Sequence, residues 1–130
     1  MKNKLLIDSN IFLSYLLKDS EFEKSRKILE NIIRNGDEIY VNQFVIEEIF
    51  TVSVYKIGLS AKKVVFSFLK DLWVNFTNTS FEDYLSFYVN KVNVKISFTD
   101  ASLIYDAISY DMEIVSFDKQ LISFYTKLVW

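Results

Sequence analysis

Three short apolar runs, separated by longer segments of helical periodicity, constrain the fold of this chain more than any other feature. The runs are residues 4–7 (KLLI), 38–41 (EIYV) and 113–116 (EIVS). Short runs that are mainly apolar are typical of strands buried on both faces of a sheet. Strands that alternate with helices predict a mainly parallel α/β sheet flanked by helices, as in a three-layer α/β/α sandwich.

Helices are expected between these runs because apolar residues recur at helical spacing and glycines mark two of the ends. In the second helix, for example, Phe22, Leu29 and Ile32 fall at this spacing and Gly36 follows the last turn. The expected helices cover residues 10–17, 21–35, 43–57, 60–72, 81–92, 97–110 and 118–125. Residues 73–76 are interpreted as a strand or a loop, and residues 127–130 as a last strand.

The length of 130 residues and the 51% apolar composition suit one packed core. No repeat, linker or low-complexity stretch divides the chain, so we expect a single domain over residues 1–130. Seven aromatic residues between positions 66 and 88 are expected to lie mostly in the core, namely Phe66, Phe68, Trp73, Phe76, Tyr84, Phe87 and Tyr88.

The absence of cysteine and histidine excludes several classes of chemistry. Disulfide scaffolds and zinc, haem or iron–sulfur sites built on those ligands are excluded, as is Ser-His-Asp or Cys-His catalysis. The net charge of −2 argues against a generally basic surface for nucleic acid. No apolar run is long enough for a membrane span or a secretory signal, so a cytoplasmic location with no membrane contact is expected.

Two aspartates lie where ligands bind in parallel α/β sheets, beyond the carboxyl ends of the strands. Asp8 directly follows the first apolar run, and Asp118 follows the last with one residue between. Each is equally suited to cap the N-terminus of a helix. Asp100 has the same two interpretations, because residues 97–100 (SFTD) have the form of a capping box.

Glu48 is less easily explained as a structural residue. It projects along the apolar stripe of its expected helix, beside Val45 and Val52, and no Lys or Arg lies three or four residues away. A metal ion or a pocket that water enters would resolve this conflict. Glu47 is interpreted as a solvated neighbour.

If these four acids converge, their mutual repulsion calls for protonation or a divalent cation. Oxygen ligands without nitrogen or sulfur favour Mg²⁺ or Mn²⁺. Asn10, two residues after Asp8, and Ser116, two residues before Asp118, are placed to aim the carboxylates by hydrogen bonds.

With these residues in place, the chain resembles the PIN-domain ribonuclease family, in particular the small VapC-type toxins of prokaryotic toxin–antitoxin pairs. The resemblance extends through nearly the whole chain. Four segments carry it. LLIDSNIFL resembles the family's opening strand with its Asp, and FVIEEIF resembles its helical Glu motif. SFTDASLI resembles the second Asp motif, and IVSFDKQL resembles the last strand with its Asp. Of the doublet Glu47-Glu48, we assign Glu48 to the motif because an aliphatic residue follows it.

The resemblance implies a single PIN-like domain that is a Mg²⁺- or Mn²⁺-dependent endoribonuclease. Asp8, Glu48, Asp100 and Asp118 would be its catalytic and metal-binding residues, supported by Asn10 and Ser116. It also implies an RNA substrate, a homodimer and an antitoxin partner, for which exposed aromatic residues would provide a surface. Cationic residues outside the acidic site would bind RNA, the candidates being Lys18, Lys24, Arg26, Lys27, Arg34, Lys56, Lys62, Lys63 and Lys70. The alternative is a catalytically inactive PIN-like module that binds RNA or protein and whose acids are only caps.

Overall fold

In the computed structural model, which describes residues 2–129, four strands form one parallel sheet in the order β3-β2-β1-β4. The strands are β1 (Lys4–Ile7), β2 (Glu38–Val41), β3 (Asn75–Phe76) and β4 (Glu113–Val115). In β1, Leu5 pairs with Ile39 of β2 on one side and with Glu113 of β4 on the other. The parallel sheet expected from the sequence is confirmed.

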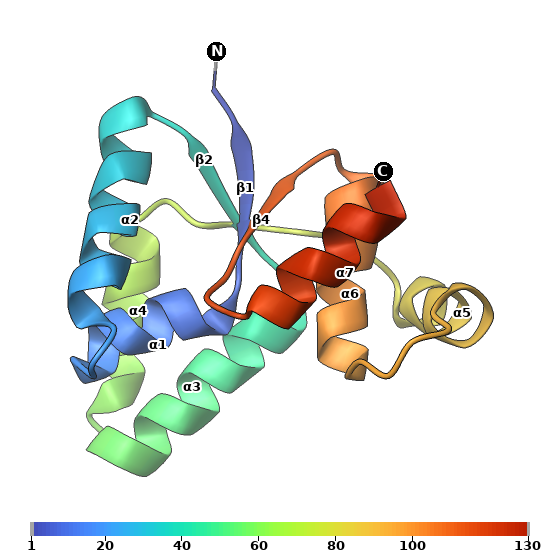
Figure 1. Ribbon diagram of the computed structural model, residues 1–130. Coiled ribbons are helices and arrows are strands. Elements are labelled where there is room, and N and C mark those ends of the chain that lie inside the picture. Colours follow the sequence, from blue (N-terminus) through green and yellow to red (C-terminus); the bar gives the residue numbers. More distant parts are fainter. Residues whose placement is uncertain (1, 130) are drawn as a thin grey trace.

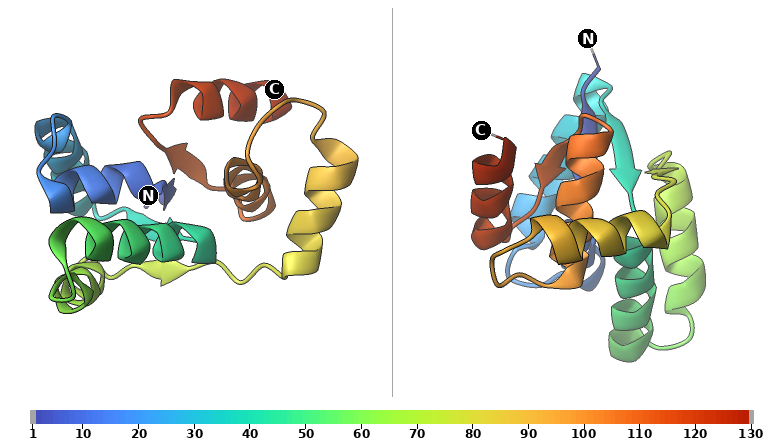
Figure 2. Two further views of the ribbon diagram at one scale, coloured as in Figure 1. Left: turned by 90° about the horizontal axis from the view of Figure 1, so that it is seen from below. Right: turned by 90° about the vertical axis from the view of Figure 1, so that its right-hand side faces the viewer.

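Helices cover both faces of this sheet. They are α1 (Ser9–Leu17), α2 (Phe22–Asn35), α3 (Gln43–Ile57), α4 (Ala61–Asp71), α5 (Phe81–Lys91), α6 (Phe98–Ser109) and α7 (Lys119–Val129). Figures 1 and 2 show α2 and α4 on one side of the sheet and α5, α6 and α7 on the other. The three-layer sandwich is therefore confirmed. None of the helices within residues 2–129 has both the length and the apolar character needed to cross a bilayer.

The central strand β1 is buried because both of its neighbours and both helical layers cover it. Leu6 and Ile7 have no exposed surface, and Phe12 at the start of α1 is equally buried. Burial on both faces is what the continuous apolar run of residues 4–7 predicts. This core fixes the position of the residues that directly follow β1.

The end of the chain differs from the prediction. Residues 127–129 belong to α7 and do not form a strand, and Trp130 lies outside the described residues. The helix continues because Leu121, Phe124 and Tyr125 keep the helical spacing and no glycine or proline interrupts it. In the uncertain segment 73–76, only Asn75 and Phe76 are in a strand.

The prediction for the aromatic residues was wrong for three of the seven. Phe66, Trp73 and Phe76 are exposed, whereas Tyr84 is buried and the remaining three are partly buried. The exposed rings line a groove of about 400 Å³ between α3, α4 and β3. The edge position of β3 explains this, because no further strand covers that side of the sheet.

Asp106, which the sequence patterns do not identify, connects three parts of the fold through hydrogen bonds. Asp106 of α6 has no exposed surface. It accepts hydrogen bonds from four side chains: the Tyr84 hydroxyl at 2.6 Å, the Thr79 hydroxyl at 2.5 Å, the Thr77 hydroxyl at 3.1 Å and the Asn42 amide at 3.3 Å. Asn42 also caps α3 through the Val45 N–H, so the network connects α6 with the start of α3 and with α5.

Candidate active site

A cavity of about 570 Å³ lies beyond the carboxyl ends of the central strands. The carboxyl end of β1 is at the lower end of the sheet in Figure 1. Its walls come from the starts of α1, α6 and α7 and from the middle of α3. All four acidic residues named from the sequence line it, together with Glu47. The full lining is Asp8, Ser9, Asn10, Phe44, Glu47, Glu48, Thr51, Val52, Ser97, Thr99, Asp100 and Asp118.

Asp8 is held between the end of β1 and the start of α1. Its Oδ1 accepts a hydrogen bond from the Ser9 N–H at 2.7 Å, which caps α1. Its Oδ2 accepts one from the Ser116 hydroxyl at 2.7 Å. Burial is the main cause that raises the pKa of Asp8, the bond from Ser116 opposes the increase, and the charges of Glu48 and Asp118 add to it.

Ser116 connects Asp8 with the last part of the site. Its hydroxyl oxygen accepts hydrogen bonds from the Asn10 amide at 3.1 Å and from the Asp118 N–H at 3.0 Å. Asn10 also accepts a bond from the Phe117 N–H through its own side-chain oxygen. The two supporting residues named from the sequence therefore contact each other and both sides of the pocket.

Asp118 does act as a helix cap. Its Oδ1 accepts hydrogen bonds from the N–H groups of Gln120 and Leu121 in the first turn of α7. Asp118 therefore caps α7 and also lines the pocket.

Glu48 lies at the pocket and not in the core. Its carboxylate accepts a hydrogen bond from the Ser9 hydroxyl at 2.6 Å, and the residue is exposed. Val52, on the same stripe of α3, lines the cavity as well. This part of the apolar stripe of α3 therefore forms a wall of the pocket and not of the core. The Glu48 carboxylate is not buried without a partner, because it is exposed to the pocket and bonded to Ser9. Glu47 is also exposed at the pocket.

Asp100 lines the pocket from the first turn of α6. There the Ser97 hydroxyl oxygen accepts a hydrogen bond from the Asp100 N–H at 3.0 Å. Burial raises the pKa of Asp100, and the negative charges of Asp8, Asp118 and Glu48 raise it further. Asp8 and Asp100 therefore both lie within the field of the other acids at this pocket.

The chemistry of these side chains fits a hard divalent cation, because carboxylate oxygens converge on one cavity and repel one another. Within residues 2–129, however, no three acidic side chains lie close enough together to form a ready-made metal site. Glu48 and Asp8 are engaged by Ser9 and Ser116 instead.

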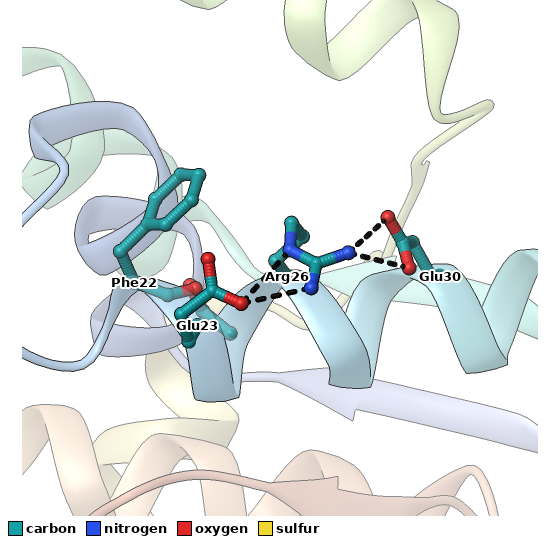
Figure 3. A network of polar contacts seen from close by, with 5 residues as sticks. Phe22, Glu23, Arg26 and Glu30 are labelled. Carbon is teal, nitrogen blue, oxygen red and sulfur yellow. Dashed lines mark hydrogen bonds and ion pairs between the residues drawn. The ribbon is translucent and has the colours of Figure 1, made fainter.

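Some of the cations proposed to bind RNA have acidic partners on α2. Figure 3 shows Arg26 between Glu23 and Glu30, with nitrogen–oxygen distances of 2.8 Å to each. The hydrogen bonds from Arg26 to Glu23 and Glu30 raise the pKa of its guanidinium above the usual range. Lys24 pairs with Glu21 at 3.3 Å. These two residues are therefore poorer candidates than the lysines of α3 and α4.

Comparisons with known proteins agree with this fold. Residues 5–127 match the model of the PIN domain family. The fold is similar to the crystal structure of Mycobacterium tuberculosis VapC20, described as a sarcin–ricin loop cleaving toxin, with a TM-score of 0.75 and 13% sequence identity. The similarity covers 92% of this chain and 93% of that one. Among curated proteins, none matches this sequence. Since the family match extends over most of the chain, the protein belongs to the PIN domain family.

Proposed function

We propose that this protein is a divalent-metal-dependent endoribonuclease and the toxin of a toxin–antitoxin pair. The observation that carries the proposal is the convergence of Asp8, Glu48, Asp100 and Asp118, from four separate elements, on one pocket. Membership of the PIN family supports nuclease activity. The structural similarity to a toxin described as cleaving the sarcin–ricin loop supports RNA as the substrate.

Each acid has a distinct role in this proposal. Asp8, Glu48 and Asp100 would hold Mg²⁺ or Mn²⁺, and Asp118 would be an outer or second-metal ligand. A bound divalent ion supplies Lewis-acid chemistry for phosphodiester hydrolysis. Ser116 and Asn10 keep the Asp8 carboxylate oriented. One of these carboxylates would accept the proton of the attacking water.

The proposal includes two protein partners, a second copy of the chain and an antitoxin. The exposed Phe66, Trp73 and Phe76 give an apolar surface of the kind that protein partners cover. Sedimentation equilibrium of the purified protein tests the homodimer. A monomer at all concentrations would remove that partner and leave the nuclease proposal standing.

The test is cleavage of labelled RNAs, including a sarcin–ricin loop oligonucleotide, in Mg²⁺ or Mn²⁺ and in EDTA. Wild-type protein is compared with Asp100→Asn and with Asp71→Asn, an exposed aspartate at the end of α4 that serves as the matched control. We expect cleavage by the wild type and the control, and none in EDTA or with Asp100→Asn. Equal cleavage by Asp100→Asn would show that a contaminating ribonuclease is responsible and would contradict the proposal.

An inactive PIN-like module that binds RNA or protein is the second candidate. The observations that favour it are the caps made by Asp8 and Asp118 and the absence, within residues 2–129, of a ready-made metal site. This candidate predicts no cleavage of any RNA and no change in melting temperature on addition of Mn²⁺. The ribonuclease proposal predicts cleavage of RNA and a change in melting temperature on addition of Mn²⁺.

A further inference from the structure

A second cavity lies directly beside the acidic pocket, between α3 and the start of α4. It measures about 400 Å³ and is lined by Phe50, Thr51, Val54, Tyr55 and Lys62. Thr51 lines both cavities, so the two lie next to each other along α3. A substrate that occupies the acidic pocket and extends along α3 must pass over this second cavity.

The spacing along α3 suits a nucleic acid strand. Tyr55 follows Glu48 by seven residues, which is two helical turns, so both side chains project from nearly the same face of the helix. The rise between them is about 10 Å. This distance corresponds to roughly three stacked nucleotides at about 3.4 Å each.

The Tyr55 ring is available for stacking. The residue is 87% exposed, the highest value among the large hydrophobic residues of the described chain. It forms no aromatic pair with any other residue in positions 2–129. Exposed aromatic rings in a groove bind single-stranded RNA by stacking on its bases, with little dependence on sequence.

Lys62 supplies the charge that an RNA backbone requires. It lines the groove from the first turn of α4, and in the part of the chain that the structure describes it has no acidic partner. A chain of net charge −2 with a pocket of five acids repels RNA, so an unpaired cation beside that pocket is an effective phosphate contact.

We infer that the groove at Tyr55 and Lys62 is an RNA subsite of this protein. Tyr55 stacks on an unpaired base about three nucleotides from the phosphate at the acidic pocket, and Lys62 contacts the backbone there. The inference rests on the proposed function for the class of substrate. It selects single-stranded or looped RNA, because a base inside a duplex presents no free face to the ring.

Binding of fluorescent single-stranded RNA, followed by anisotropy in an Asp100→Asn background, tests the subsite without cleavage. Tyr55→Ala is expected to weaken binding by about 5- to 150-fold, the range for loss of one stacked base. Tyr55→Phe keeps the ring and is expected to bind within about twofold of the parent. Lys62→Gln is expected to reduce the slope of log Kobs against log salt by about 0.7.

Matched controls lie on α5, on the other side of the molecule from α4 (Figure 2). Val89→Ala and Lys91→Gln alter an exposed apolar residue and an exposed lysine there and should change neither affinity nor salt slope. With catalytic protein, Tyr55→Ala should raise KM with kcat nearly unchanged, since the ring binds ground state and transition state alike.

Failure of the subsite and failure of the proposed function give different results. If the wild type cleaves RNA and Tyr55→Ala binds and cleaves equally well, the subsite is wrong and the nuclease stands. If the wild type cleaves no RNA but Tyr55→Ala loses RNA binding, the subsite stands and the nuclease is wrong. If Tyr55→Ala shifts the monomer–dimer equilibrium and leaves RNA affinity unchanged, the groove is a protein interface and the inference is overturned.

Discussion

Replacement of Asp106 by alanine is expected to destabilise this protein more than any substitution of an exposed acid. Four donors lose a charged acceptor at once. Two of them keep a second contact, because the Asn42 amide still reaches Ser102 at 3.0 Å and the Thr79 hydroxyl still reaches Tyr110 at 3.3 Å. The Tyr84 hydroxyl, in a residue only 2% exposed, is left without its 2.6 Å acceptor.

The expected loss is about 3–5 kcal/mol of the free energy of unfolding. An unpaired buried donor costs about 1–3 kcal/mol, so the loss of the acceptor by both the Tyr84 and the Thr77 hydroxyl centres on about 4 kcal/mol. For a chain of this length, about 3–5 °C of melting temperature corresponds to each kcal/mol, so the melting temperature should fall by roughly 10–20 °C.

Urea denaturation and thermal melts of the wild type, Asp106→Ala and Asp71→Ala provide the measurement, with the exposed Asp71 as control. A double-mutant cycle with Tyr84→Phe isolates the hydroxyl contact, for which we expect a coupling of about 1.5–3 kcal/mol. If Asp106→Ala and Asp71→Ala lose the same stability within about 0.5 kcal/mol, the buried network is absent in solution and the reasoning fails.

Three further predictions concern the pocket and the buried tyrosine. Ser116→Ala should lower kcat of RNA cleavage by about 10- to 100-fold, because Asp8 loses its orienting donor; unchanged initial rates would contradict this. Asp100→Asn should raise the melting temperature at neutral pH without metal, because burial and like charges disfavour the carboxylate, and Mn²⁺ should then stabilise it less than the wild type. Burial raises the pKa of Tyr84 above its usual 10.0, so the folded state retains a proton that the unfolded state releases. Stability should therefore fall as pH rises above about 10, and Tyr84→Phe should flatten that decline in urea midpoints measured from pH 9 to 11.

The sequence was most informative where local signals agree with the tertiary fold. The bounds of β1, β2 and α3 were predicted to the residue, because apolar runs mark the two strands and Gly58 marks the end of α3. The placement of Asp8 and Asp118 at one end of the sheet followed from parallel strands, since all their carboxyl ends lie at the same edge, whereas Glu48 and Asp100 joined them through the family resemblance.

Contacts between distant residues could not be predicted in the same way. Periodicity places Glu48 on an apolar stripe, but it does not tell whether that stripe faces the core or the wall of a pocket. The contact with Ser9, 39 residues away, places Glu48 at the pocket. Asp106 carries a similar signal, since it lies among Leu103, Ile104 and Ala107 in α6. Its partners are up to 64 residues away, and no local rule identifies them.

The pairing of the first strand with the last has a consequence for biosynthesis. Leu5 pairs with Glu113, and the bond between Ser116 and Asp8 joins residues 108 positions apart. Contacts between residues so far apart in the sequence form late, because a long loop must close before they contribute any stability. At about 5–20 residues per second, a ribosome needs roughly 5–22 seconds to advance over the 108 positions from Asp8 to Ser116. While that segment is being made, the nascent chain carries Asp8 without the Ser116 hydroxyl that orients it, so the acidic pocket is completed only after β4 has been synthesised.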